Sequence, residues 1–206
     1  MFSGTATSPP HFSFSEQLPV TQQALSFASS RHRGQHRDAD GATFLVHPAE
    51  VASLLARLGY DDHVVAAAVL HDVLEGTDTQ HGDLEARFGS QVADLVASVS
   101  DDPRIPDEGR RKDELRERVS GAGDEALAVF AADKVSKVRE LRLLLATGAP
   151  AQNAQVKFER YRAALEMLDS RLSDKHLLAL LRFEVEALTQ LPPRLGSTGT
   201  TAADQA

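Results

Sequence analysis

Cysteine is absent from the 206 residues of this chain. Its absence excludes a disulfide scaffold and a metal site built from thiolates, and it fits a reducing cytosol. The chain also lacks the run of about 20 apolar residues that a membrane-spanning helix needs. Its first twenty residues have neither the basic start nor the continuous apolar middle of a secretory signal. A soluble cytoplasmic protein without membrane association is therefore expected.

Basic residues are fewer than acidic ones, so that the formal net charge is −8. A field of this sign repels phosphate chains, so the composition argues against nonspecific nucleic-acid binding. Any anionic ligand would have to be held by local basic side chains. Two sequence clusters offer them, although each taken alone is more typical of a solvated surface. These clusters are Arg31, Arg33 and Arg37, and then Arg104, Arg110, Arg111 and Lys112.

No segment alternates apolar and polar residues with the two-residue period of a half-buried strand. Hydrophobic residues make up 42% of the chain, which is enough for one sizeable core, and their spacing is helical. The predicted fold class is therefore all-α, a single-domain helical bundle over residues 18–190. Residues 1–17 and 191–206 are rich in Ser, Thr, Pro and Gly, and are expected to be flexible tails.

The boundaries of the expected helices follow from caps, apolar stripes and breaks. Thr21 is the predicted cap of the first helix, Pro48 opens the second, and Ser90 caps a later one. One continuous helix is expected from Asp61 or Asp62 to about Gly76. The other helices are expected to end at 88, to begin near 110, and to cover 124–145, 153–169 and 174–189.

The segment AAAVLHDVLEGT, residues 66–77, carries the first sign of chemistry. On a helix, His71 and Glu75 share a face, and Asp72 lies beside them. An imidazole with carboxylates suits borderline or hard divalent ions such as Mn²⁺, Fe²⁺, Mg²⁺ or Zn²⁺. A His-Asp pair by itself is more typical of a solvated helix end, so the rest of the chain has to decide.

Two further residues extend this cluster into a candidate metal site. His47 stands directly before a helix in FLVHP, and Asp133 follows small and apolar residues in AVFAADKVSKV. Each has an ordinary alternative: a histidine with local partners at a helix start, and an aspartate paired with Lys137 four residues on. Two histidines and two aspartates would hold one ion and leave positions open for water and substrate, as hydrolytic metal chemistry requires.

Together these segments resemble the HD-domain metal-dependent phosphohydrolases, within them the hydrolase domain of RelA/SpoT-type enzymes, and particularly small stand-alone alarmone hydrolases of the Mesh1 kind. The resemblance covers residues 21–188. It rests on six segments in order, which are HRGQHR from His32, FLVHP from Phe44, AAAVLHDVLEGT from Ala66, FGSQVADLV from Phe88, SDDPRIP from Ser100 and AADKVSKVREL from Ala131.

The resemblance implies an HD-type fold and a role for each matched residue. Glu75 corresponds to an acid that positions or activates the attacking water, which in the family breaks a ribose 3′ phosphate ester and releases pyrophosphate. The four implied metal ligands, with Mn²⁺ as the usual ion, are His47, His71, Asp72 and Asp133. The side chains implied to meet substrate phosphate are Arg37, Arg104, Lys134 and Lys137.

Two positions depart from the family pattern. Where the family has Glu-Asp, this chain has Glu75-Gly76, so one acid near the attacking water is missing. Gly76 suggests a left-handed helix cap instead. Where the family's Ala-Asp-Arg-Leu-His-Asn element ends in asparagine, this chain has Lys137. A lysine at that position is open to three interpretations: a phosphate contact, a pair with Asp133, or a block to the usual nucleoside position.

The sequence thus predicts a Mn²⁺-dependent phosphohydrolase that acts on guanosine 3′,5′-bis(diphosphate) or a related alarmone. Two alternatives stay open: an HD phosphohydrolase for another nucleotide or phosphate ester, and a nucleotide sensor that has lost turnover with the missing acid. The expected partner is a small phosphorylated nucleotide, neither nucleic acid nor a membrane. Association into a homo-oligomer is left open.

Overall fold

The computed structural model describes residues 12–148 and 153–190. Within these ranges all regular elements are helical, and the only β-type pairing is an isolated antiparallel bridge between His36 and Thr43. The predicted all-α fold is therefore confirmed. None of the helices described has the length and apolar character that a membrane span would need.

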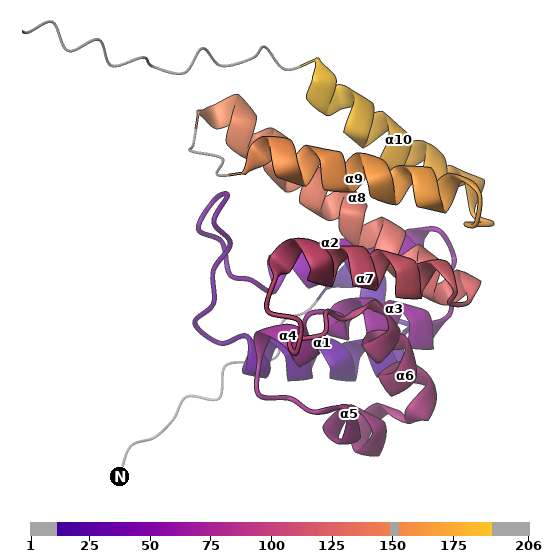
Figure 1. Cartoon of the computed structure of the whole chain (residues 1–206). Coiled ribbons are helices and arrows are strands. Elements are labelled where there is room, and N and C mark those ends of the chain that lie inside the picture. Colours follow the sequence, from indigo (N-terminus) through magenta and orange to yellow (C-terminus); the bar gives the residue numbers. More distant parts are fainter. Residues whose placement is uncertain (1–11, 149–152, 191–206) are drawn as a thin grey trace, which may run out of the picture.

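Most of the helices follow one another with short connections, whereas residues 32–45 form a longer loop between the first two α-helices (Figure 1). In chain order they are η1 (Ser13–Ser15), α1 (Pro19–Arg31), α2 (Val46–Arg57), α3 (Asp62–Leu70), α4 (Val73–Gly76), α5 (His81–Phe88), α6 (Ser90–Val99), α7 (Glu108–Ser120), α8 (Asp124–Thr147), α9 (Ala154–Asp169) and α10 (Lys175–Thr189).

The start of α1 differs from the prediction. Pro19 occupies its first turn, and Thr21 is a buried residue inside the helix rather than its cap. The carboxylate of Asp62 instead accepts hydrogen bonds from the backbone N–H groups of Val20 and Thr21, each at 2.9 Å. A side chain from α3 thus caps α1, which sequence spacing cannot reveal because the partners lie more than 40 positions apart.

Smaller corrections apply at three other boundaries. Val46 opens α2, so Pro48 is its third residue, and Gly89 rather than Ser90 is the residue before α6. Residues 12–17 fall within the predicted N-terminal tail, yet they contain the 3₁₀ helix η1, which contacts α1 and α2. The rest of the expected tails, residues 1–11 and 191–206, lies outside the described residues.

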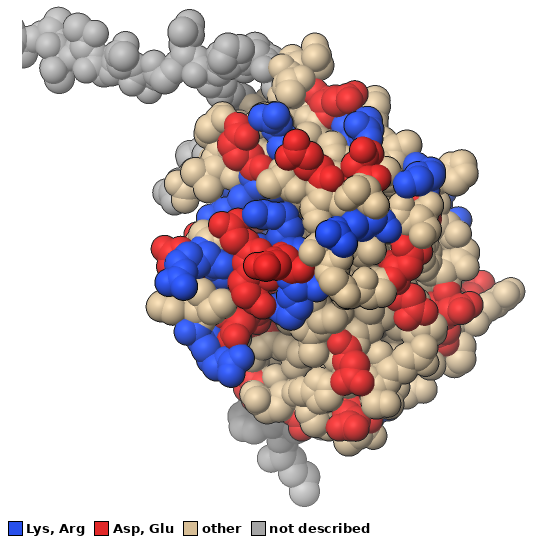
Figure 2. Space-filling model, turned by 45° about the vertical axis from the view of Figure 1, so that its right-hand side comes forward, with Lys and Arg blue, Asp and Glu red and all other residues tan. Residues whose placement is uncertain are grey.

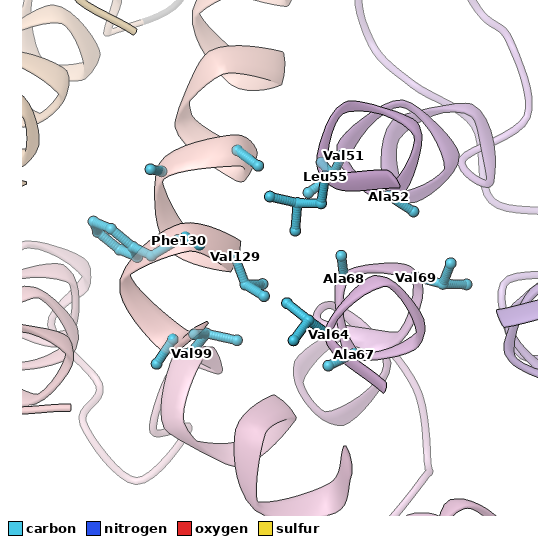
Figure 3. Packing of buried hydrophobic residues seen from close by; sticks show 14 of the residues in the cluster. Val51, Ala52, Leu55, Val64, Ala67, Ala68, Val69, Val99, Val129 and Phe130 are labelled. Atoms are coloured by element: carbon cyan, nitrogen blue, oxygen red, sulfur yellow. The ribbon is translucent and has the colours of Figure 1, made fainter. Parts of the chain in front are cut away.

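The centre of the fold is α3, in which every residue from 64 to 70 is buried. It packs against α1, α2, α6 and α8. In Figure 3, Val64 and Ala68 of α3 lie between side chains of α2, such as Leu55, and Val129 of α8. Small alanines let these backbones approach closely, so the end of α3 is held firmly.

One predicted helix is broken in two. The expected continuous helix over residues 61–76 ends at Leu70, and α4 begins only at Val73. His71 and Asp72 form the junction, with Asp72 at φ −95° and ψ −5°. Because α3 is buried on all sides, this change of direction brings both side chains to the place where α2 and α8 meet α3.

The C-terminal helices α8, α9 and α10 contact one another and lie together at one side of the molecule (Figure 1). A buried carboxylate joins two of them: Glu184 of α10 accepts a 2.7 Å hydrogen bond from Arg139 Nε of α8 and pairs with Arg142 at 2.8 Å. Glu184 is only 3% exposed, so this pairing fixes α10 on α8.

Candidate metal centre and its cavity

The four predicted ligand residues meet at one point. His47 comes from the first turn of α2, His71 and Asp72 come from the α3–α4 junction, and Asp133 lies in α8. All four side chains are buried, with residue exposures of 2 to 5%. Two buried carboxylates in an apolar core need a cation or several donors to offset the loss of hydration.

The donor atoms are spaced as ligands around a single ion. His47 Nε2 and His71 Nε2 are 3.2 Å apart. Asp133 Oδ1 lies 3.2 and 3.5 Å from these two nitrogens, and Asp72 Oδ2 lies 3.4 and 3.3 Å from them. Adjacent ligands with bonds of about 2.1 Å to one ion are separated by roughly this much. Three of the residues, His47, His71 and Asp133, have ligand atoms that all lie within 4.8 Å of one another.

Hydrogen bonds at the Nδ1 atoms of both rings turn their Nε2 atoms toward the centre of the cluster. His71 Nδ1 donates to the carbonyl oxygen of Ala68 at 2.8 Å, which assigns its lone pair to Nε2. Asp133 Oδ1 is buried and makes no hydrogen bond of good geometry among the described residues, although Lys137 Nζ lies 3.1 Å away as an ion-pair partner. Two imidazole nitrogens and a buried carboxylate oxygen therefore face each other, an arrangement that fits a divalent cation.

Without an ion, the charges of the cluster compensate one another. Burial disfavours the charged form of His71, yet the Asp72 and Asp133 carboxylates outweigh it and raise the pKa of His71 to about 10. Burial likewise opposes ionisation of Asp133, but Lys134 and Lys137 hold its pKa well below the usual value. The site is thus a set of paired charges in which an ion would displace a proton.

Glu75 and Gly76 lie at the mouth of this site, on α4. Glu75 Oε2 accepts a 3.0 Å hydrogen bond from the backbone N–H of Asp101. Glu75 is an exposed residue, yet loss of water around its carboxylate and the nearby Asp72 carboxylate raise its pKa. Gly76 is not among the glycines with positive φ, so the predicted left-handed cap is wrong.

A cavity of about 300 Å³ opens beside the metal cluster. Its wall includes His47, Asp72, Glu75, Gly76 and Lys137, together with the loop before α2. Arg37 of that loop lines it as predicted and pairs with Asp40 and, at 3.9 Å, with Glu50.

A second cavity of about 290 Å³ adjoins the first, since both are lined by Asp38, Lys137 and Glu140. Lys134 lies in this second wall, where its Nζ donates to Asp133 Oδ2 at 2.6 Å and rests 4.1 Å from the centre of the Phe130 ring. Additional basic residues in this wall are Lys112, Arg116, Lys157 and Arg160.

Arg104 does not join these residues, which corrects one prediction. Its side chain is 88% exposed and pairs with Asp102 at 2.7 Å within its own loop. It lines neither cavity. The loop instead contributes the backbone of Asp101, whose carboxylate also binds Lys112 at 2.6 Å.

The comparisons with known proteins agree with this geometry. The family model described as HD domain matches residues 24–161, which includes all four candidate ligands. The chain belongs to the HD domain family. The match ends within α9, so the family region contains the metal cluster and helices that line both cavities.

Relatives of this HD domain include enzymes with named activities. The chain is 36% identical over 143 residues to the guanosine-3′,5′-bis(diphosphate) 3′-pyrophosphohydrolase MESH1 of Danio rerio, covering 68% of this chain and 79% of that protein. It is also 36% identical over 140 residues to the MESH1 of Homo sapiens, covering 66% and 78%. A solved structure of a metazoan SpoT ortholog that hydrolyses ppGpp and plays a role in starvation responses matches with a TM-score of 0.73, 27% identity and coverage of 91% and 100%.

Several residues of this HD domain site were not predicted from the sequence. Ser136 contacts His47 Nδ1 and in turn donates to Glu50. Lys157, Arg160 and Tyr161 of α9 line the second cavity. Glu50 follows His47 by three positions and Ser136 follows Asp133 by three, which is helical spacing from a predicted ligand. The α9 residues carry no such pattern, because only the packing of α9 on α8 brings them to the cavity.

Proposed function

We propose that this chain is a metal-dependent hydrolase that removes the 3′-diphosphate from guanosine 3′,5′-bis(diphosphate). The observation that carries the proposal is the convergence of His47, His71, Asp72 and Asp133 beside a cavity in an HD domain. The relatives that cover most of its length bear the name of this activity. Hydrolysis would consume water and the alarmone and yield GDP and pyrophosphate.

The ion would be held by His47 Nε2, His71 Nε2, Asp72 and Asp133. Nitrogen and carboxylate donors without a thiolate suit Mn²⁺, the ion proposed here, and a bound divalent ion lowers the pKa of water and polarises a phosphorus–oxygen bond. Glu75 would orient the attacking water and accept its proton. Its raised pKa places it closer to neutral pH than an ordinary glutamate, which favours a general base.

The basic residues of the two cavities would neutralise the substrate's phosphates. Lys137 lies where the cavities join, 3.1 Å from Asp133 Oδ1, and Arg37 lines the metal side. Lys112, Lys157 and Arg160 are available on the other side for a second phosphate group. Two adjoining cavities of similar size suit a nucleoside that carries diphosphates at two positions.

Phosphate binding by a few basic side chains within the cavities is consistent with the net negative charge of the chain. Figure 2 shows basic and acidic side chains intermixed on the face in view, without a separate positive region. The positive side chains that meet a nucleotide would therefore be those of the cavities. This arrangement favours a small anion over a nucleic-acid chain.

The test is hydrolysis by the purified full-length chain. Protein loaded with Mn²⁺ is incubated with guanosine 3′,5′-bis(diphosphate), and GDP, pyrophosphate and phosphate are measured separately. The expected result is GDP and pyrophosphate in equal amounts, with loss of turnover in His71→Ala. Absence of products, or equal turnover in the His71→Ala variant, would overturn the proposal. Parallel reactions with Mg²⁺, Zn²⁺ and Fe²⁺ test the choice of Mn²⁺.

A second candidate is hydrolysis of another nucleotide or phosphate ester. It is favoured by two residues of the cavity wall, Gly76 and Lys137, which replace an acid and an amide of the family pattern. A larger opening at Gly76 and an additional cation at Lys137 would change which ligand fits. A panel of nucleotides in the same assay separates the two candidates by their ratios of kcat/KM.

A further inference from the structure

We propose that Ser136 and Glu50 form a positioning relay that holds His47 with its Nε2 atom toward the ion. The inference rests on the proposed metal site and assigns two residues that the family pattern does not supply. Ser136 stands where the family element Ala-Asp-Arg-Leu-His-Asn has histidine. The relay is therefore a property of this chain's own residues.

Three side chains form an unbroken line behind the ligand. His47 Nδ1 lies 3.0 Å from Ser136 Oγ, and Ser136 Oγ donates to Glu50 Oε2 at 2.8 Å. His47 and Ser136 are each 2% exposed. The Glu50 side chain is 33% exposed and forms the outer end of the line.

The proton positions follow from what each group can donate. An ionised carboxylate only accepts, and a serine hydroxyl carries one proton. Since that proton points to Glu50, Ser136 Oγ can only accept from His47. The Nδ1 atom of His47 therefore carries the hydrogen, and the lone pair is left on Nε2, which faces His71 Nε2 at 3.2 Å and Asp133 Oδ1 at 3.2 Å.

Without the relay, no hydrogen-bond partner would fix the Nδ1–H tautomer of the His47 imidazole. A neutral histidine that lacks a fixed Nδ1 partner exchanges between two tautomers and turns about its side-chain bonds. Mutation of the hydrogen-bond partner behind a metal-bound histidine typically lowers metal affinity by about 10- to 100-fold. The same size of effect is expected here.

The outer end of the relay is itself held by charge. Glu50 Oε1 lies 3.5 Å from Arg139 Nη1, and Arg139 Nε donates to the buried Glu184 of α10 at 2.7 Å. Arg37 Nη1 approaches Glu50 Oε2 at 3.9 Å. These two arginines hold the Glu50 carboxylate beside Ser136, where it accepts the hydroxyl hydrogen bond.

The experiment compares Ser136→Ala, Ser136→Thr and Glu50→Ala with the unaltered chain. Mn²⁺ affinity is measured by calorimetry on full-length protein, and the His47 Nδ1–H resonance is followed by NMR after loading with Zn²⁺, which is diamagnetic. We expect Ser136→Ala and Glu50→Ala to weaken Mn²⁺ binding about 10- to 100-fold and to shift or lose that resonance. Ser136→Thr keeps the hydroxyl and should retain both properties.

The outcomes separate this inference from the proposed function. If the unaltered chain binds no divalent ion, the metal-dependent function itself fails. If it binds the ion while Ser136→Ala and Glu50→Ala keep the affinity within twofold, only the relay is overturned. A loss of affinity with an unchanged His47 resonance overturns it as well, because charge or packing would then be the cause. Should Ser136→Ala fail to fold, the partly exposed Glu50→Ala decides by the same two readouts.

Discussion

Lys137 Nζ lies 3.1 Å from Asp133 Oδ1, the same oxygen that faces both imidazole nitrogens of the metal cluster. The ammonium group thus shares a carboxylate with the proposed ion. Burial opposes its charge, yet Asp133 and Asp72 raise the pKa of Lys137 well above the usual value. The lysine therefore stays charged beside the metal position, whereas the family pattern has a neutral asparagine there.

Replacing this lysine with the family residue should have opposite effects on metal and substrate. In Lys137→Asn, the repulsion between ammonium and ion disappears, and Mn²⁺ affinity should rise by about tenfold. Loss of a phosphate partner should raise KM by about the same factor. Calorimetry and steady-state kinetics measure the two values. The control is Lys112→Asn, because Lys112 pairs with Asp101 rather than with a ligand. Its Mn²⁺ affinity should stay within twofold, and an equal rise of Mn²⁺ affinity in both variants would refute the argument.

Gly76 offers a direct test of the missing acid. A Cβ atom built there would meet only His32, with Cε1 at 3.4 Å, which is ordinary van der Waals contact. The substitution Gly76→Asp should therefore fold and raise kcat by about tenfold or more, since proton transfer by a positioned acid contributes roughly 10²- to 10⁴-fold. Gly76→Asn provides an uncharged side chain of the same shape. Equal kcat values for the two variants would show that the carboxylate has no part in the reaction.

The acid limb of the pH profile should belong to Glu75. Burial and the Asp72 carboxylate raise the pKa of Glu75 above 4.5, and a general base is active only when it is deprotonated. The value of kcat should fall as pH decreases through this raised pKa. Glu75→Gln should lower kcat by about 10²- to 10⁴-fold and remove that limb. A profile with the same acid limb in the variant would assign the limb to another group.

The two arginines predicted to meet phosphate should now differ. Arg37 lines the cavity with a side chain that is 13% exposed, while Arg104 is 88% exposed and paired with Asp102. We expect Arg37→Gln to raise KM by about tenfold, consistent with loss of a charge-assisted hydrogen bond. Arg104→Gln should leave KM within twofold. A larger effect of Arg104→Gln would mean that its loop closes over the substrate.

Arg118 should stabilise the fold without touching the site. Its guanidinium donates to the carbonyl oxygens of Ala97, Ser98 and Ser100 at 2.8 to 2.9 Å and thereby caps the end of α6. Arg118→Ala should lower the free energy of unfolding by roughly 2 to 3 kcal/mol, because these carbonyls lose a charged donor. Chemical denaturation followed by circular dichroism measures the change.

The control for Arg118 is a surface ion pair. Arg162 is 60% exposed and pairs with Glu159 on the same helix. Arg162→Ala should change the free energy of unfolding by less than about 0.5 kcal/mol. A similar loss in both variants would contradict a capping role for Arg118.

The sequence predicted the helices well because helical periodicity and caps are local properties. The long helix α8 and the last two helices agree with the expected ranges within a few residues. The break between α3 and α4 was missed, since residues 64–70 continue apolar up to His71 and no proline or glycine marks the junction. Only the packing of α3 on four neighbours determines where that helix has to end.

Site residues could be predicted where their residue type is unusual for the surrounding sequence. Residues whose place in the site depends only on three-dimensional packing could not. Asp133 in an apolar helix and His47 before a proline are unusual, and both converge with His71 and Asp72 as expected. Arg104 matched a family position in sequence, yet its loop turns it to solvent. Ser136 and Glu50 are common residue types that lie 86 positions apart, and their hydrogen bond forms only because α2 and α8 pack together.

The position of α9 sets how far the chain can be shortened. Its Lys157, Arg160 and Tyr161 form part of the second cavity wall, while α10 covers α8 and α9 and buries Glu184 against α8. A fragment that stops after α8 would keep all four candidate metal ligands but lose the part of the second cavity wall that α9 provides. A fragment that stops after α9 would leave Arg139 and Arg142 without their buried counterion. We therefore expect a stable fragment to extend through α10, beyond residue 161, where the match to the family ends.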